Sequence, residues 1–174
     1  MKKIAVILTF LVSALFSLNL NDIKSIKTQF YQEIINSSGN KIYYKGTMFA
    51  KKDKNQALWI YQQPIYKEIY YLNGKIVIIE PDLEQATFAK LKKIPNIITL
   101  LKSAKKIDNN TYVTKFNNTK YFITLKNNTL YKISYIDEMK NKVNVTLINP
   151  KINIDISDQR FQYHIPKGYD ILKE

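Results

Sequence analysis

The chain has 174 residues, no cysteine and a formal net charge of +13, from 27 lysines and arginines against 14 acidic residues. The lack of cysteine excludes disulfides, thiolate metal sites, a cysteine nucleophile and a lipid-modified N-terminal cysteine. The positive charge favours an anionic partner such as nucleic acid or anionic lipid. However, Arg160 is the single arginine, and base and phosphate recognition rely on the planar arginine fork, so we expect no nucleic-acid partner.

The N-terminal segment has the pattern of an export signal. Lys2 and Lys3 precede a run of thirteen mostly apolar residues, "IAVILTFLVSALF". This run is too short for a membrane-spanning helix, so we predict a secretory signal peptide over residues 1–17, with an uncleaved anchor as the alternative. Residues 18–174 are then one exported domain of ordinary size.

The domain is predicted to begin with an amphipathic helix. The segment has an N-cap residue, apolar residues three or four positions apart, and a closing glycine, which is the pattern of a helix with one buried face. These are Asp22, then Ile23, Ile26, Phe30 and Ile34, and finally Gly39.

A first group of β-strands follows this helix. Asn73-Gly74 between two apolar runs is a strong hairpin signal, because both central residues of a type I′ turn need positive φ. The strands are predicted over 41–51, 57–63, 66–72, 75–79 and 84–91.

A second helix and a second group of strands complete the chain. Pro95 opens the helical pattern of 94–107, and an edge strand is expected within 161–172. A long run of hairpin-linked strands closes into a barrel or curls around other elements, and the two helices are available for this. We predict a mainly β fold with α, in which a curled antiparallel sheet wraps around two helices. The further strands are predicted over 111–116, 120–126, 130–136 and 142–148.

Catalytic groups are scarce in this sequence. Its four isolated glycines form no phosphate-binding loop, and the single histidine, His164, lacks partners for a metal site or a nucleophile–base pair. Three carboxylates, Glu80, Asp82 and Glu84, would share one side of an extended strand, where Asp82 and Glu84 could act as a glycosidase pair. Pro81-Asp82 favours a turn instead. We therefore predict no enzyme activity, no cofactor and no metal site.

Residues 57–61 have two apolar faces. In a strand, Ala57, Trp59 and Tyr61 lie on one side, and Leu58 and Ile60 lie on the other. A sheet with one solvated face needs only one apolar side. Together with the 13 tyrosines, this pattern fits either an ordinary β-rich core or a cavity lined by amphipathic rings.

Several segments resemble the periplasmic outer-membrane lipoprotein carriers, the LolA family. "ALWIYQQP" (57–64) is similar to their Trp-x-x-x-x-Pro segment, and "NGKIVIIEPDLEQA" (73–86) to their hairpin followed by an Asp-Leu-Glu-Gln stretch. "QFYQEI" (29–34) resembles part of their first helix, and "FQYHIPKGYDIL" (161–172) their C-terminal segment. The resemblance covers essentially residues 18–174.

The resemblance implies a function and a set of partners. Carriers of this family take acylated lipoproteins from an inner-membrane ABC exporter and bring them to an outer-membrane acceptor or the outer membrane itself. The resemblance implies a curved, incomplete antiparallel β-barrel covered by helices, which enclose an apolar cavity. The acyl chains of the cargo bind in this cavity under a helical lid. We expect a monomer, and the alternative is a lipid-sensing or regulatory module of the same fold.

The resemblance also implies site residues. Trp59 matches the family tryptophan, and "IPNIITLL" (94–101) the lid helix. The family arginine that latches the lid has no counterpart, and Lys52 is the nearest candidate, although lysine lacks the fork. The predicted lining of the acyl-chain cavity is Phe30, Trp59, Tyr61, Ile69, Tyr71, Ile76, Ile78, Ile97, Ile98 and Leu101.

Overall fold

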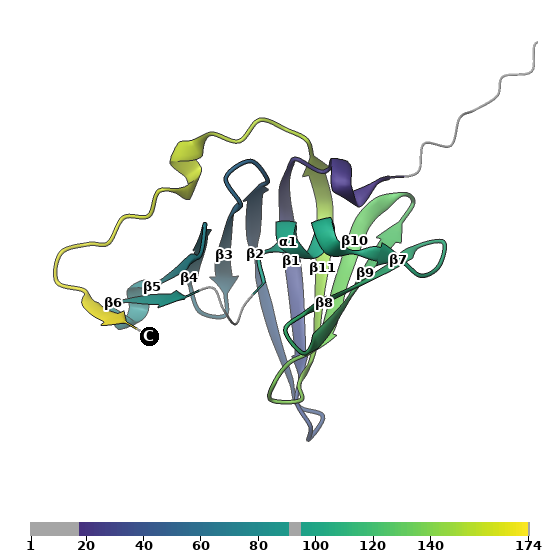
Figure 1. Ribbon diagram of the computed structural model, residues 1–174. Coiled ribbons are helices and arrows are strands. Elements are labelled where there is room, and N and C mark those ends of the chain that lie inside the picture. Colours follow the sequence, from purple (N-terminus) through teal and green to yellow (C-terminus); the bar gives the residue numbers. More distant parts are fainter. Residues whose placement is uncertain (1–17, 91–94, 174) are drawn as a thin grey trace, which may run out of the picture.

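One sheet organises the computed structural model, which describes residues 18–90 and 95–173 (Figure 1). The strand order is β12-β6-β5-β4-β3-β2-β1-β11-β10-β9-β8-β7, and β7 and β12 do not pair with each other, so the sheet stays open. Neighbouring strands are antiparallel except β12 and β6, which are parallel. The predicted signal peptide, residues 1–17, lies outside the described ranges, as do Leu91 and Ile94 of the predicted elements.

The strands and helices have the following bounds. The strands are β1 Ser25–Ile35, β2 Lys41–Lys51, β3 Gln56–Gln63, β4 Lys67–Leu72, β5 Lys75–Glu80, β6 Gln85–Lys90, β7 Lys105–Lys106, β8 Thr111–Phe116, β9 Thr119–Lys126, β10 Thr129–Ile136, β11 Lys142–Ile152 and β12 Asp170–Lys173. The helices are α1, Ile97–Ser103, and the short 3-10 turns η1 Leu20–Asp22, η2 Pro81–Leu83 and η3 Asp158–Phe161.

The predicted first helix is wrong: this segment is the central strand β1. It pairs along its length with β2 and with β11. Ile26, Phe30 and Ile34 are four residues apart, and a spacing of four keeps residues on one side of a strand as well as of a helix. Two hydrogen-bonded neighbours and β-branched or aromatic residues favour the strand. Gly39, with φ +82°, belongs to the turn between β1 and β2.

The sheet curls around α1. This helix contacts β2 and β3 on one side and β8 on the other, although β1, β11, β10 and β9 lie between them in the sheet. In Figure 1, α1 accordingly lies across the inside of the curved sheet. The predicted fold class, an incomplete antiparallel barrel, is confirmed, but in the described ranges a single α-helix covers it. No helix in those ranges is long and apolar enough to cross a membrane.

The two faces of β3 belong to two different apolar cores. Ala57, Trp59 and Tyr61 pack inside with α1. Leu58 and Ile60 pack on the outer face, under the segment that runs from β11 to β12. We call residues 153–169 the strap; Figure 1 shows it crossing from β11 to the far end of the sheet. The double apolar pattern of residues 57–61 is therefore explained by a covered outer face.

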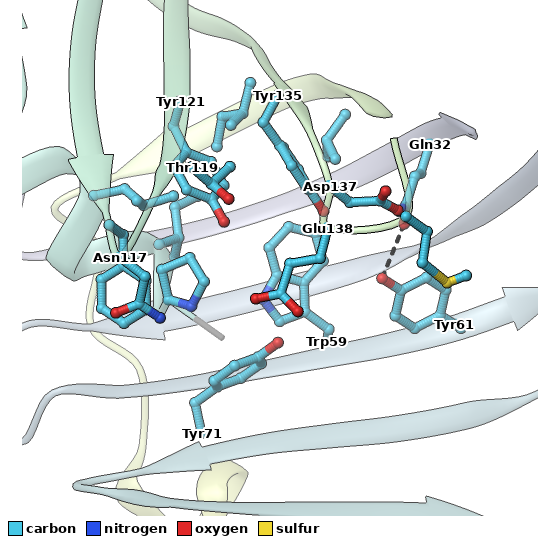
Figure 2. Close-up of a pocket in the computed structure, with 17 residues that line it drawn as sticks. Gln32, Trp59, Tyr61, Tyr71, Asn117, Thr119, Tyr121, Tyr135, Asp137 and Glu138 are labelled. Atoms are coloured by element: carbon cyan, nitrogen blue, oxygen red, sulfur yellow. Dashed lines mark hydrogen bonds between the residues drawn. The ribbon is translucent and has the colours of Figure 1, made fainter. Parts of the chain in front are cut away.

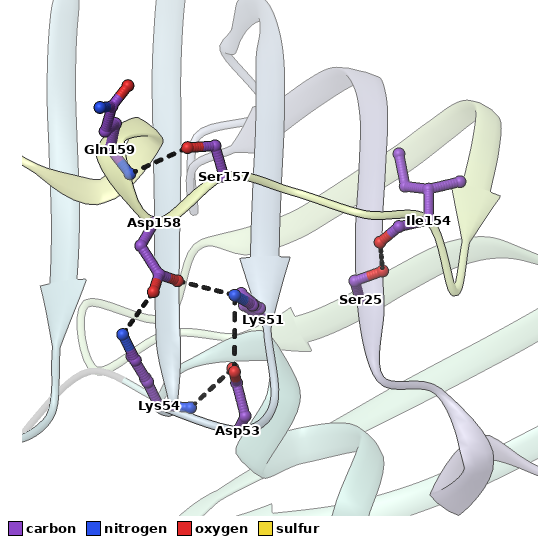
Figure 3. A network of polar contacts seen from close by, with 8 residues as sticks. All are labelled: Ser25, Lys51, Asp53, Lys54, Ile154, Ser157, Asp158 and Gln159. Carbon is purple, nitrogen blue, oxygen red and sulfur yellow. Dashed lines mark hydrogen bonds and ion pairs between the residues drawn. The ribbon is translucent and has the colours of Figure 1, made fainter.

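Polar contacts hold the strap at its middle (Figure 3). Asp158 accepts hydrogen bonds from Lys51, at 2.7 Å, and from Lys54. These two bonds lower the pKa of the Asp158 carboxyl to about 2. Near the start of the strap, the Ser25 hydroxyl donates to the Ile154 carbonyl at 2.5 Å. The strap is therefore fixed to β1 and β2 as well as packed on the outer face.

The predicted turns are confirmed. Asn73 and Gly74, with φ of +36° and +97°, join β4 to β5. Pro81 begins the turn η2 between β5 and β6, and Glu84, with φ +50°, ends it. The three carboxylates of this segment therefore belong to a bend in the chain and not to a continuous strand.

Candidate functional site

A cavity lies between α1 and the concave face of the sheet (Figure 2). Its volume is ≈ 450 Å³, within the range of about 300–1,000 Å³ that is usual for ligand sites. Residues of β1, β3 and β4 form one wall of the cavity, and residues of β8 to β11 form the other. Pro95, Ile97 and Leu100 of the α1 segment cover the space between the two walls. The lining residues are Gln32, Trp59, Tyr61, Tyr71, Pro95, Ile97, Leu100, Phe116, Asn117, Thr119, Tyr121, Ile133, Tyr135, Asp137, Glu138, Met139 and Val145.

The residues predicted to line the cavity fall into two groups. Trp59, Tyr61, Tyr71 and Ile97 line it. The others pack in the same inner core without reaching the surface of the cavity: Phe30, Ile69, Ile76, Ile78, Ile98 and Leu101.

Phe30 supports the aromatic wall from behind. Its ring centroid lies 4.9 Å from that of Trp59 and 5.1 Å from that of Tyr61, both edge to face. Such pairs add about 0.5–1.5 kcal/mol beyond the burial of their surface. Phe30 itself is buried and lies opposite Gly46 in the β1–β2 register. The position of Trp59 and Tyr61 in the cavity therefore depends on Phe30.

Most of the second wall was missed by the sequence prediction. Tyr121, Ile133, Tyr135 and Val145 project from β9, β10 and β11, all of which were predicted as strands. The alternation of apolar residues along these strands predicts which side chains face inward. Their position opposite Trp59 depends on how far the sheet curls, which the alternation does not specify. The loop 137–139 adds Asp137, Glu138 and Met139 at the mouth.

The cavity contains several phenol groups. Tyr61 donates to the Gln32 side chain at 2.9 Å. Burial, with a smaller contribution from Tyr121 and Asp137, raises the pKa of Tyr135 to about 12. Burial also raises the pKa of Tyr61, Tyr71 and Tyr121. These phenols are therefore protonated at neutral pH, and each keeps an O–H to donate.

The helix α1 is tied to the sheet at both ends. At its start, Asn96 caps the helix by accepting from the Ile98 amide at 3.0 Å and donates to the Asn55 carbonyl at 3.1 Å. At its end, the Ser103 and Thr114 hydroxyls lie 2.8 Å apart. Ile97, Ile98, Leu100 and Leu101 of α1 are buried.

Lys52, the predicted latch, contacts a different element. Its ammonium group donates to the Asn21 carbonyl at 2.5 Å, and its amide donates to the Lys24 carbonyl at 2.8 Å. The turn is instead linked to the α1 segment through Asn55, three residues later, whose carbonyl accepts a hydrogen bond from the Asn96 side chain. In this conformation Asn55 and Asn96 hold the helix, and a latching role for Lys52 stays a prediction.

Removing the Asn96 side chain should loosen α1. Asn96→Ala loses both the cap and the bond to Asn55, so we expect the free energy of unfolding to fall by about 1–2 kcal/mol. Amide hydrogen exchange in residues 96–104 should accelerate. Asn96→Ser is the matched control, because serine keeps the cap but not the amide donor, and it should lose about half as much. Equal stability of wild type and Asn96→Ala in urea would contradict this account.

Comparison with known proteins places the chain among the lipoprotein carriers. No model of a known protein family matches it. It is 38% identical to the outer-membrane lipoprotein carrier protein of Campylobacter jejuni, over 99% of this chain and 100% of that protein. The chain belongs to the outer-membrane lipoprotein carrier family. The carrier protein of Helicobacter hepaticus is 32% identical over 99% of this chain and 96% of its own length.

Membership of the carrier family confirms the resemblance found in segments 57–64 and 73–86. An uncharacterized conserved protein from Thermus thermophilus has a similar fold, with a TM-score of 0.55 and 8% identity over 88% of this chain and 93% of that one. At this identity the match supports the fold alone. The family motif residue Trp59 lies in the wall of the cavity, behind α1.

Proposed function

We propose that this member of the carrier family binds the acyl chains of lipoproteins in its cavity and carries them through the periplasm. The observation that carries the proposal is the aromatic and aliphatic cavity of ≈ 450 Å³ under α1. Each buried methylene is worth about 0.8 kcal/mol, so acyl chains do not leave a membrane for water unaided. A cavity covered by a short helix would shield the acyl chains from water during transport.

The partners follow from this role. We propose that the protein acts as a monomer, receives cargo from an inner-membrane ABC exporter and delivers it to an outer-membrane acceptor or to the outer membrane itself. Export would use residues 1–17 as a signal peptide, and residues 18–174 would act as one domain. The role needs no chemical step, so we propose a carrier and not an enzyme.

The cavity as observed is smaller than a triacylated cargo requires. Its volume of ≈ 450 Å³ lies toward the lower end of the range of about 300–1,000 Å³ that holds one ligand of drug size. Three long acyl chains together are larger than such a ligand. Binding of three chains requires a wider cavity, and movement of α1 away from the sheet is the simplest way to provide it.

A two-membrane transfer assay tests this function. Inner-membrane vesicles that contain the exporter and a triacylated lipoprotein are mixed with the protein, and the soluble complex is then added to outer membranes. We expect a soluble complex, followed by transfer of the lipoprotein. The same lipoprotein without its acylated cysteine is the control and should form no complex. A stable complex without transfer would favour the lipid-sensing alternative, and no complex would refute the proposal.

A further inference from the structure

Three tyrosines surround the cavity from different strands. Tyr71 comes from β4, Tyr121 from β9 and Tyr135 from β10. The exposed fraction is 7% for both Tyr71 and Tyr121. Figure 2 shows Tyr71 and Tyr135 extending from opposite walls toward the middle of the cavity. The rings of Tyr121 and Tyr135 lie 4.7 Å apart, and both residues also contribute to raising the pKa of Tyr71.

None of these three hydroxyls donates a hydrogen bond to a residue of 18–90 or 95–173. Two other tyrosines differ: Tyr61, which lines the same cavity, donates to Gln32, and Tyr70 on the outer face donates to Glu68. Among the described residues, the fully buried side-chain polar atom that lacks a partner is Gln56 Oε1, so the hydroxyls of Tyr71, Tyr121 and Tyr135 stay accessible from the cavity. Water, or an acceptor group of a molecule bound in the cavity, can reach them there.

The chemistry of the cavity restricts what that partner is. Three protonated phenols are available as donors, and the Trp59 indole N–H is a further donor that no described residue engages. Pure hydrocarbon offers no acceptor to any of them. An acyl group attached as an ester offers a carbonyl oxygen that accepts hydrogen bonds, and the ester carries no donor group that would itself need an acceptor.

We propose that Tyr71, Tyr121 and Tyr135 form a phenol cluster that donates hydrogen bonds to the ester carbonyls of the cargo's acyl groups. This inference rests on the proposed function and deepens it: the cavity selects acyl esters and not hydrocarbon chains in general. The hydrocarbon of the chain packs against the aliphatic lining, and the carbonyl end of the chain meets the phenols. The cluster thereby sets how deeply the acyl group enters.

Binding of two matched lipopeptides tests the phenol cluster. One is a cysteinyl peptide with three palmitoyl groups, and the other has ether-linked hexadecyl chains in place of the two ester-linked palmitoyl groups. A neutral hydrogen bond is worth about threefold to tenfold in affinity. We expect the wild type to bind the ester lipopeptide about tenfold more tightly than the ether lipopeptide.

Phenylalanine variants assign the preference to the hydroxyls. In the Tyr71→Phe, Tyr121→Phe, Tyr135→Phe triple variant the ester preference should disappear, while affinity for the ether lipopeptide stays within about twofold. Tyr112→Phe is the control, since Tyr112 is in the same core but outside the lining; it should keep the preference. In the Tyr71→Phe single variant, affinity for the ester lipopeptide should fall by about threefold. This variant replaces the triple variant in the test if the triple variant does not fold.

The outcomes separate this inference from the proposed function. Equal affinity of the wild type for the two lipopeptides, or an ester preference that survives in the triple variant, overturns the role of the phenols and leaves the carrier function standing. Absence of binding to both lipopeptides overturns the carrier function and the phenol cluster together. Loss of binding to both lipopeptides in a folded triple variant also overturns the inference, because it assigns the hydroxyls a general structural role.

Discussion

Gly46→Ala should lower the free energy of unfolding by about 3 kcal/mol, the largest stability loss we expect from a single added methyl group. A Cβ at Gly46 would lie 2.1 Å from the Ile60 carbonyl oxygen and 2.7 Å from the Phe30 ring. β3 is paired with β2 on one side and with β4 on the other, so its backbone cannot simply move away. The Phe30 ring that occupies this space also supports Trp59 and Tyr61.

Chemical denaturation of two glycine variants checks this expectation. Gly39→Ala is the control, since Gly39 has φ +82° but nothing within 4 Å of its added Cβ. Its free energy of unfolding should fall by only about 1–2 kcal/mol, because alanine is less stable than glycine in the left-handed backbone conformation. If Gly46→Ala is no less stable than Gly39→Ala, the close approach of β3 and Phe30 to Gly46 does not limit the fold.

A disulfide between α1 and β8 should strongly weaken the loading of triacylated cargo. The Ser103 and Thr114 hydroxyl oxygens lie 2.8 Å apart. Because C–S bonds are longer than C–O bonds, a Ser103→Cys, Thr114→Cys pair brings its sulfurs near the ~2.05 Å of a disulfide. The bond would hold α1 against the sheet and keep the cavity at its volume of ≈ 450 Å³. We expect affinity for a tripalmitoylated peptide to fall by about tenfold or more, since only an open state accepts it.

Reduction of the disulfide provides the decisive comparison. The natural chain has no cysteine, so the engineered pair is the only one that responds to oxidant. Dithiothreitol should restore binding, and each single cysteine variant should bind normally under oxidising conditions. Normal loading of the oxidised double variant would show that cargo enters without movement of the C-terminal end of α1.

The hairpins of this protein were predictable because their signals are local. Asn73-Gly74 and Pro81-Asp82 determine their own backbone angles, and the strands on either side begin and end within a residue or two of their predicted limits. The helix that begins at Ile97 was predictable for the same reason, since Pro95 and the apolar residues after it are neighbours in the chain, but it ends at Ser103 and not at the predicted residue 107. The resemblance to the carrier family was found in some of these segments, and the 38% identity over 99% of the chain then established membership.

The error at β1 has a different cause. Ile26, Phe30 and Ile34 satisfy both a helical and an extended periodicity, and Thr28 and Gln32, which share their face, are polar. Because these two buried positions carry polar residues, the sequence does not show the alternation of apolar and polar residues that would have indicated a strand. Only the presence of β2 and β11 on both sides of this segment decided between the two structures.

The sequence by itself determined the antiparallel meanders, the helix that begins at Ile97 and the polar turn at Pro81, because each depends on residues close together in the chain. It also determined the family, through identity over almost the whole chain. The tertiary structure decided that residues 25–35 are a strand, that the strap covers Leu58 and Ile60, and that Tyr121 and Tyr135 face Tyr71 and Trp59 across a cavity. These features depend on the curl of a twelve-stranded sheet. Curl arises from the packing of distant segments against one another, and no local pattern of residues specifies it.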